Sequence, residues 1–192
     1  MHFVRRGGVY VDCAGQSFRD FLAGKLPALP GERPAMDDFD DHLSTIFPEV
    51  RLKTFLEMRG ADAGPQPMLC ALSAFWVGLL YDSAALDEAW QMVRDWRGHE
   101  REGLRRAVPA MGLQAPLRLT TAQAIAREAV AIARRGLARR RRLNPRGEDE
   151  TRFLEPIEEI AASGRPLAQH WLERYRGDWN EDVRPVFGEA RL

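Results

Sequence analysis

Cysteine and lysine are scarce in this chain of 192 residues, and neither sign of charge is in excess. The two cysteines, Cys13 and Cys70, are too few for a disulfide scaffold and lack the spacing of a structural zinc site. All but two of the 28 basic residues are arginines, and 28 acidic residues balance them. The basic excess that is typical of nucleic-acid-binding proteins is therefore missing.

Long apolar runs are missing as well. The longest, Leu69–Tyr81, is shorter than the ~20 residues that a helix needs to cross a bilayer, and no charged-then-apolar signal segment stands at the start of the chain. Apolar residues still make up 45% of the chain, which is enough to build a core. We expect a soluble, reduced, cytoplasmic protein that binds neither membranes nor nucleic acid.

The first third of the chain carries strand signals. Gly7-Gly8 stands between two short strand-like stretches, His2–Arg6 and Val9–Asp12. Glycine readily takes the positive φ of two-residue hairpin turns, so this pattern predicts a β-hairpin.

The rest of the chain carries helix signals. Asp82 is a favourable N-cap, and an apolar stripe of Leu86, Trp90, Val93 and Trp96 follows it at helical spacing, which predicts a helix. We predict an α+β fold, with a β-rich part over residues 1–65 and a mainly helical region over residues 66–192.

The segment Glu49–Arg59 alternates strictly between two kinds of residue, which predicts one strand with two different faces. The apolar face carries Val50, Leu52, Thr54, Leu56 and Met58, and the other face carries Glu49, Arg51, Lys53, Phe55, Glu57 and Arg59.

The charged face has two interpretations. Glu57 and Arg59 are neighbours about 6.5–7 Å apart on a strand, and further cations follow on the same face. A carboxylate beside several cations can hold Mg²⁺ together with phosphates, and the cations can neutralise charge on a transferring phosphoryl group. Alternatively, the face is solvated and carries only cross-strand ion pairs, and composition alone favours this second interpretation.

Two other charged segments favour structural roles. The acidic stretch Asp37–His42 offers possible metal ligands, but aspartate is favoured near helix N-termini, so we expect it to cap a short helix over residues 43–47. A cluster that we call the arginine run can attract nucleic acid or acidic lipid, but it ends a predicted helix, where cations complement the helix dipole. It consists of Arg134, Arg135, Arg139, Arg140, Arg141 and Arg142.

The stretch His42–Asp62, which contains the alternating segment, resembles the signature of plant-type glutamate–cysteine ligases. Further stretches that resemble this family are Val9–Cys13, Phe21–Pro27, Leu69–Asp82 and Pro185–Phe187. The resemblance implies a glutamine-synthetase-like fold, in which the polar face of a curved antiparallel sheet forms the active site.

The resemblance also implies a reaction. Such ligases use ATP and Mg²⁺ to phosphorylate the γ-carboxylate of glutamate, and the amine of cysteine then attacks the γ-glutamyl phosphate. The product is γ-glutamylcysteine, and the reaction is the first step of glutathione biosynthesis.

Four residues of this chain take roles by the resemblance. Glu57 is implied as a Mg²⁺ ligand, and Arg59 as a catalytic contact to glutamate or its developing γ-phosphate. Arg51 and Lys53 are implied as contacts to substrate or to the phosphates of ATP.

The chain departs from the family in three ways. It resembles only the C-terminal portion of such ligases, so we expect that it needs the missing N-terminal portion or a partner chain. Plant members carry a redox-sensitive cysteine pair, and Cys13 occupies one of its positions, but the partner position holds Ala28 here. The loop Gln66–Met68 lacks the family's usual residues. The alternative is a truncated, non-catalytic relative that acts as a helical interaction module.

Overall fold

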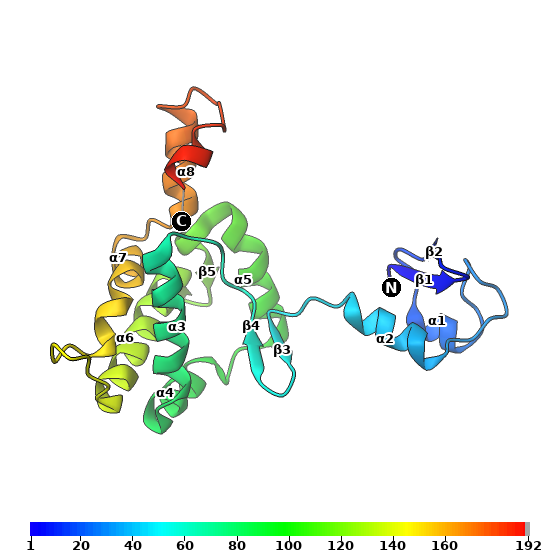
Figure 1. Ribbon diagram of the computed structural model, residues 1–192, viewed down its shortest axis with the longest axis horizontal. Coiled ribbons are helices and arrows are strands. Elements are labelled where there is room, and N and C mark those ends of the chain that lie inside the picture. Colours follow the sequence, from blue (N-terminus) through cyan, green and yellow to red (C-terminus); the bar gives the residue numbers. More distant parts are fainter. Residues whose placement is uncertain (191–192) are drawn as a thin grey trace. The chain divides into compact units, whose positions relative to one another are not determined.

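The computed structural model describes residues 1–190, and the chain divides into two compact units, Met1–Ala61 and Asp62–Leu192 (Figure 1). Antiparallel strand pairs occur together with a mainly helical C-terminal region, so the predicted α+β class is confirmed. The predicted assignment of residues 1–65 to a catalytic sheet and of residues 66–192 to a helical region stays a prediction.

The first unit begins with the predicted hairpin. β1 (Phe3–Arg6) pairs with β2 (Val9–Asp12), and Gly7 and Gly8 adopt φ values of 56° and 80° in the turn. The next elements are α1 (Phe18–Leu22) and α2 (Met36–Ser44). The buried core beneath them consists of Val4, Cys13, Phe21 and Leu26.

The acidic stretch lies inside α2 rather than before it. The helix expected over residues 43–47 instead spans Met36–Ser44, so Asp37 and Asp38 occupy its first turn, where the helix dipole favours negative charge. The Asp38 carboxylate accepts a hydrogen bond of 2.8 Å from the backbone N–H of Ala35. The prediction that this stretch caps a helix over residues 43–47 was therefore wrong, and Asp38 instead stabilises the start of the helix that contains it.

The single strand predicted over residues 49–59 was wrong. The chain turns back at residues 53–55 and forms the hairpin of β3 (Val50–Leu52) and β4 (Leu56–Met58). The backbone N–H of Lys53 donates to the carbonyl of Phe55 at 2.9 Å, which closes the turn. No glycine, proline, asparagine or aspartate marks the turn, so residues 53–55 carry no turn signal.

The single curved sheet that the resemblance implied is not formed within residues 1–190. The strands described there form three separate antiparallel pairs, β1–β2, β3–β4 and the short β5 (Pro116–Leu117) with β6 (Thr120–Thr121). Each pair is joined by a tight turn, and its strands span only two to four residues.

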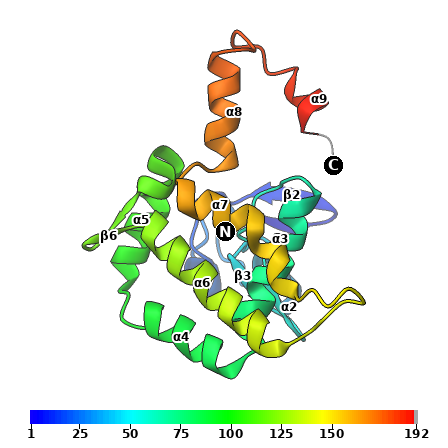
Figure 2. The ribbon, with the colours of Figure 1, turned by 90° about the vertical axis from the view of Figure 1, so that its left-hand side faces the viewer.

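The second unit is mainly helical (Figure 2). Its first part contains α3 (Gln66–Leu80), α4 (Ser83–Val93), α5 (Gly98–Met111), the 3₁₀ helix η1 (Gly112–Gln114) and α6 (Ala122–Arg140). The 3₁₀ helix η2 (Glu150–Leu154), α7 (Glu155–Ser163), α8 (Leu167–Arg176) and α9 (Val186–Glu189) follow. The Asp82 carboxylate accepts a hydrogen bond from the Ala85 N–H at 2.9 Å, so the predicted start of α4 is confirmed.

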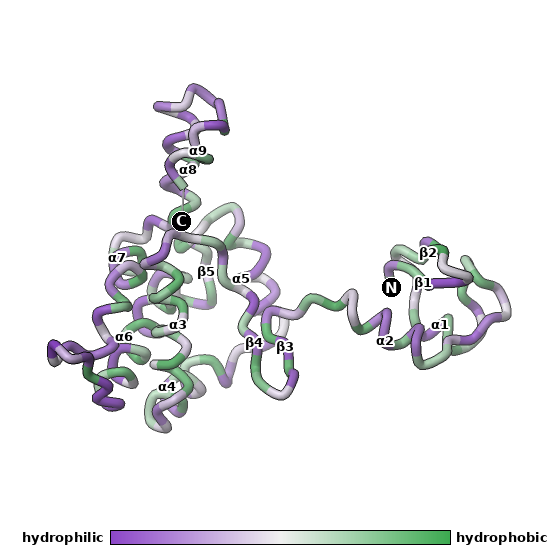
Figure 3. Tube along the Cα trace, viewed as in Figure 1, coloured by the Kyte–Doolittle hydropathy of each residue, from purple (hydrophilic) through white to green (hydrophobic). Residues whose placement is uncertain are grey.

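The core of this unit lies between α3, α4, α6 and η2. Its buried members are Ala74, Leu79, Ala85, Ile132, Ala133, Leu137 and Leu154. Hydrophobic residues follow α3 along most of its length (Figure 3). No single helix within residues 1–190 is long and apolar enough to span a membrane, and α3 with α4 passes that test only as a pair bent by 92°.

Candidate functional site

The β3–β4 hairpin brings the charged residues of the alternating segment together. Arg51 lies directly opposite Glu57 in the antiparallel register, and the backbone N–H of Arg59 donates to the carbonyl of Glu49 at 2.8 Å, which extends the ladder by one pair. Residues directly opposite each other share a face of a sheet. We call Arg51, Lys53, Glu57 and Arg59 the hairpin charge cluster.

Arg51 and Glu57 form a close ion pair. Nε of Arg51 donates to Oε2 of Glu57 at 2.7 Å, and Nη2 of Arg51 lies 2.6 Å from the same oxygen. Both side chains remain about one-third exposed. The other carboxylate oxygen, Oε1, accepts no hydrogen bond from residues 1–190 that the structure records, so it is open to a ligand.

Arg59 is held more loosely. Its Nη1 lies 3.6 Å from Oε2 of Glu57, which is an ion pair without a short hydrogen bond. Its guanidinium carbon lies over the ring of Phe47, 5.6 Å from the ring centroid.

The electrostatics of the cluster keep Glu57 ionised. The hydrogen bond from Arg51 is the main cause that lowers the pKa of Glu57 below its ordinary value. Desolvation opposes this shift, and the charges of Arg51, Arg59 and Lys53 add to it. Lys53 therefore acts on Glu57 through its charge, and no ion pair of Lys53 is found among the described side chains.

The cluster suits an anionic ligand. Its three cations outnumber its carboxylate Glu57 and the neighbouring Glu49, which lies opposite Arg59, so it carries a local excess of positive charge. Glu57 can supply one oxygen ligand to a cation such as Mg²⁺, which commonly takes one or two carboxylates together with phosphate oxygens. Nowhere in residues 1–190 do three or more His, Cys, Asp or Glu side chains gather into a metal-binding group, so further protein ligands would have to come from outside these residues.

Sequence reasoning identified the shared face but missed two features of it. Arg51 was expected further along a single strand, and Phe47 was not included in the alternating segment. The signal for Phe47 was present, because it continues the odd-numbered series of the charged face two residues before Glu49.

The acidic stretch in α2 does not form a competing metal centre. The guanidinium of Arg6 donates to both carboxylate oxygens of Asp38, at 2.7 and 3.2 Å. Nε of Arg5 donates to Asp41 at 2.7 Å. These two carboxylates therefore join α2 to β1.

The arginine run is largely neutralised by carboxylates. Arg134 pairs with Glu158, Arg135 with Glu88 and Glu128, Arg139 with Asp82 and Glu88, and Arg140 with Glu150. These pairs connect α6 to neighbouring elements of the second unit. Most of the run therefore serves the packing of the helices, whereas only charges that complement the helix dipole were expected from the sequence.

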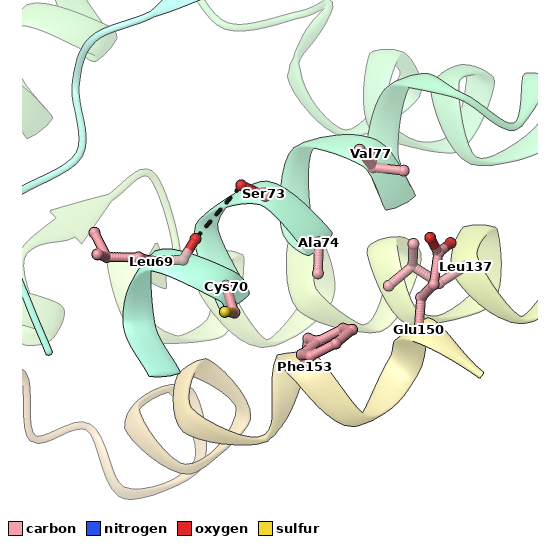
Figure 4. Close-up of a pocket in the computed structure, with 8 residues that line it drawn as sticks. All are labelled: Leu69, Cys70, Ser73, Ala74, Val77, Leu137, Glu150 and Phe153. Atoms are coloured by element: carbon pink, nitrogen blue, oxygen red, sulfur yellow. Dashed lines mark hydrogen bonds between the residues drawn. The ribbon is translucent and has the colours of Figure 1, made fainter. Parts of the chain in front are cut away.

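The second unit also contains an open, apolar pocket of about 380 Å³ between α3, α6 and η2 (Figure 4). Its lining residues are Leu69, Cys70, Ser73, Ala74, Val77, Leu137, Glu150 and Phe153. The Ser73 hydroxyl donates back to the Leu69 carbonyl at 3.4 Å, and Glu150 is paired with Arg140. The pocket thus lacks a free acid–base pair, and the hairpin charge cluster remains the better candidate.

Comparison with known proteins agrees with the resemblance. A model of glutamate-cysteine ligase family 2 (GCS2) matches residues 1–189. The chloroplastic glutamate–cysteine ligases of Brassica juncea, Nicotiana tabacum and Arabidopsis thaliana are each 49% identical to this chain over 189 residues. The match covers 98% of this chain, but only 36% of the Brassica protein and 35% of the other two. The chain therefore spans about a third of the length of these relatives.

The names of the relatives overturn one expectation. All three ligases are named chloroplastic, which contradicts the cytoplasmic location expected from the sequence. The content of apolar and charged residues does not distinguish a chloroplast protein from a cytoplasmic one, so the expectation had no physical basis in the residues.

Proposed function

The chain belongs to glutamate-cysteine ligase family 2, and from this premise we propose that it forms part of an ATP-dependent glutamate–cysteine ligase. The γ-phosphoryl group of ATP passes to the γ-carboxylate of glutamate. The cysteine amine then attacks the γ-carbonyl carbon and displaces inorganic phosphate, which leaves γ-glutamylcysteine. The reaction would begin the biosynthesis of glutathione.

The hairpin charge cluster is the observation that supports this proposal. Phosphoryl transfer needs fixed positive charge where the phosphate oxygens lie, and three cations on one face can supply it. Arg59 has no short hydrogen bond to Glu57, so its N–H donors are available to glutamate or to the γ-phosphoryl group. Arg51 and Lys53 would contact the phosphates of ATP or the substrate.

Glu57 would hold Mg²⁺. It is ionised at neutral pH, and its Oε1 accepts no recorded hydrogen bond from residues 1–190, so one oxygen remains for a metal. Bound Mg²⁺ would neutralise charge on the phosphates that it bridges. The hydrogen bond from Arg51 fixes the orientation of the carboxylate at the same time.

The remaining ligase portion is the partner that this proposal requires. The chain corresponds to about a third of its relatives, and a site with one metal-binding carboxylate needs further ligands from elsewhere. We expect little ligase activity from the 192-residue chain alone. We expect activity when the chain replaces the matching 189 residues of the Brassica juncea ligase in a chimaera.

Glu57→Gln in this chimaera tests the site. The variant keeps the shape of the side chain but loses its charge, so turnover should fall at least ~10²-fold, because metal stabilisation of phosphoryl transfer is worth several kcal/mol. Glu102→Gln is the matched control, since Glu102 lies on α5, which has no buried residue, and pairs with Arg105 and Arg106 of the same helix. Turnover that survives Glu57→Gln nearly unchanged would contradict the metal role.

A non-catalytic helical interaction module predicts a different result. In that case the chimaera would fold but form no γ-glutamylcysteine, and neither ATP nor glutamate would protect it against thermal unfolding. Ligand-dependent stabilisation of the chimaera that Glu57→Gln abolishes would exclude this alternative.

A further inference from the structure

Phe47 is an unusually exposed aromatic residue beside the hairpin charge cluster. Its side chain is 74% exposed, although exposing a large ring to water is unfavourable. The contact that the structure records for this ring is with the guanidinium of Arg59, whose Cζ lies over it at 5.6 Å from the centroid. This distance lies within the range of a cation–π interaction.

Arg59 forms no short hydrogen bond with its carboxylate neighbour, because Arg51 occupies the nearer oxygen of Glu57. Oε2 of Glu57 receives two short contacts from Arg51, at 2.6 and 2.7 Å, and lies 3.6 Å from Arg59. The structure records no side-chain hydrogen bond from Arg59 within residues 1–190. Within residues 1–190, the contacts recorded for the Arg59 guanidinium are thus the ring of Phe47 and a loose ion pair.

A contact with a ring face leaves hydrogen-bonding capacity intact. The attraction acts between the positive charge and the π-electrons, and it uses none of the N–H groups of the guanidinium. Those N–H groups can still form the paired hydrogen bonds by which arginine recognises carboxylates and phosphates. A carboxylate in place of Phe47 would occupy them instead.

The backbone around Phe47 is constrained. Pro48 follows it, and a residue before proline is restricted to extended conformations. Two residues later, the carbonyl of Glu49 accepts the hydrogen bond from the Arg59 N–H. Phe47 is therefore tied through a short, stiff segment to the strand pair that carries Arg59.

We propose that Phe47 is a positioning residue, which holds the guanidinium of Arg59 by a cation–π contact and leaves its N–H donors free for the γ-carboxylate or γ-phosphoryl group. This inference rests on the proposed function, because it assigns to Arg59 a ligand that the ligase reaction supplies.

The first test uses the 192-residue chain and needs no activity. Protons above an aromatic ring experience an upfield ring-current shift, so the Cδ protons of Arg59 should resonate upfield of ordinary arginine values in NMR spectra. Phe47→Leu should remove the shift and Phe47→Tyr should keep it. Phe55→Leu is the matched control, because Phe55 is 60% exposed on the same hairpin and has no recorded cation contact. Arg59 protons that do not respond to Phe47→Leu would overturn the proposal.

The second test uses the Brassica chimaera. Phe47→Leu should lower kcat/KM for glutamate about 2- to 30-fold, the range expected for an exposed to a desolvated cation–π contact. Phe47→Tyr should restore it, and Phe55→Leu should leave it unchanged. Mono-, di- and trifluorinated phenylalanine at position 47 should lower it stepwise, because fluorine withdraws charge from the ring face while the side chain keeps nearly the same shape.

The outcomes separate the two proposals. A flat response to fluorination, with strong losses in Arg59→Gln and Glu57→Gln, would refute the positioning role of Phe47 and leave the proposed function intact. If Arg59→Gln and Glu57→Gln also kept full activity, the proposed site itself would be wrong. A stepwise loss with fluorination supports both proposals, since a packing role alone would not follow the charge of the ring.

Discussion

The close approach of α3 and α6 makes Gly136→Ala a sharp test of the second unit. An ideal Cβ atom at Gly136 would overlap the carbonyl oxygen of Gly78, and it would lie 3.0 Å from the Cβ of Ala85. A Cβ at Gly78 would overlap the carbonyl of Ala133 in turn. The neighbours are mainly backbone atoms, so no flexible side chain can move aside.

The magnitude follows from two opposing effects. Restoring contact distances that real Cβ atoms show requires the helices to separate by roughly 1–1.5 Å, and overpacking of this kind costs ~1–3 kcal/mol. Alanine is a better helix former than glycine by ~0.5–1 kcal/mol, which offsets part of that cost. We expect Gly136→Ala to lower the free energy of unfolding by about 1–2 kcal/mol. Gly103→Ala in α5, where a Cβ meets no atom within 4 Å, should instead raise it by ~0.5–1 kcal/mol.

Urea unfolding followed by tryptophan fluorescence measures both variants. All five tryptophans lie in the second unit, so the signal reports on that unit alone. Equal slopes with shifted midpoints would show that stability has changed rather than the nature of the transition. If Gly136→Ala were as stable as the unchanged chain, or were stabilised like Gly103→Ala, the close helix crossing would be refuted.

Two further predictions concern the first unit and the thiols. Asp38→Asn should lower the free energy of unfolding by ~1–3 kcal/mol at pH 7, because it weakens the buried, charge-assisted contact with Arg6. The hydrogen bond from Arg6 holds the pKa of Asp38 below its ordinary value. The stabilisation is therefore present above about pH 4, the pKa of an unfolded aspartate, and should disappear as the pH falls through the lowered pKa. Unfolding measured at several pH values would detect this loss. Cys70 is exposed, whereas Cys13 is fully buried, and burial raises the pKa of the Cys13 thiol. A thiol reagent should therefore modify Cys70 alone in the native chain and both cysteines in denaturant. Two fast-reacting thiols in the native chain would contradict the packing of Cys13.

Local chemistry made part of the fold predictable. Gly7 and Gly8 form the first turn because they adopt positive φ values, and the Asp82 carboxylate caps the start of α4. Both effects act within a few residues, so both could be predicted from the sequence. The hairpin at residues 53–55 escaped prediction because it lacks turn-forming residues. Its consequence is large, since residues six apart on one strand lie ~20 Å from each other, whereas the turn brings Arg51 within 2.6 Å of Glu57.

Helix faces were harder to predict than helix starts. Two members of the apolar stripe, Leu86 and Trp90, are 44% and 58% exposed, whereas Val93 and Trp96 are half-buried. Ala85 is buried instead, and the smaller Ala89 packs against the core with it. Small residues occupy the core here because α4 and α6 approach closely. A Cβ atom at Gly136 would lie only 3.0 Å from the Cβ of Ala85. Hydrophobicity alone carries no information about that spacing.

The chain contains two groups of arginines, and the contrast between them bears on function. Arg135 and Arg139 of α6 each contact two carboxylates, which is how arginine behaves when it serves structure. In the hairpin charge cluster, Arg51 and Arg59 share the single carboxylate of Glu57, and Lys53 adds a third positive charge. Like charges on one face repel unless an anion binds between them. Glu49, opposite Arg59, is the other carboxylate of this face, so three cations still outnumber two carboxylates there, and a phosphate-bearing substrate is the kind of ligand that would supply the missing negative charge.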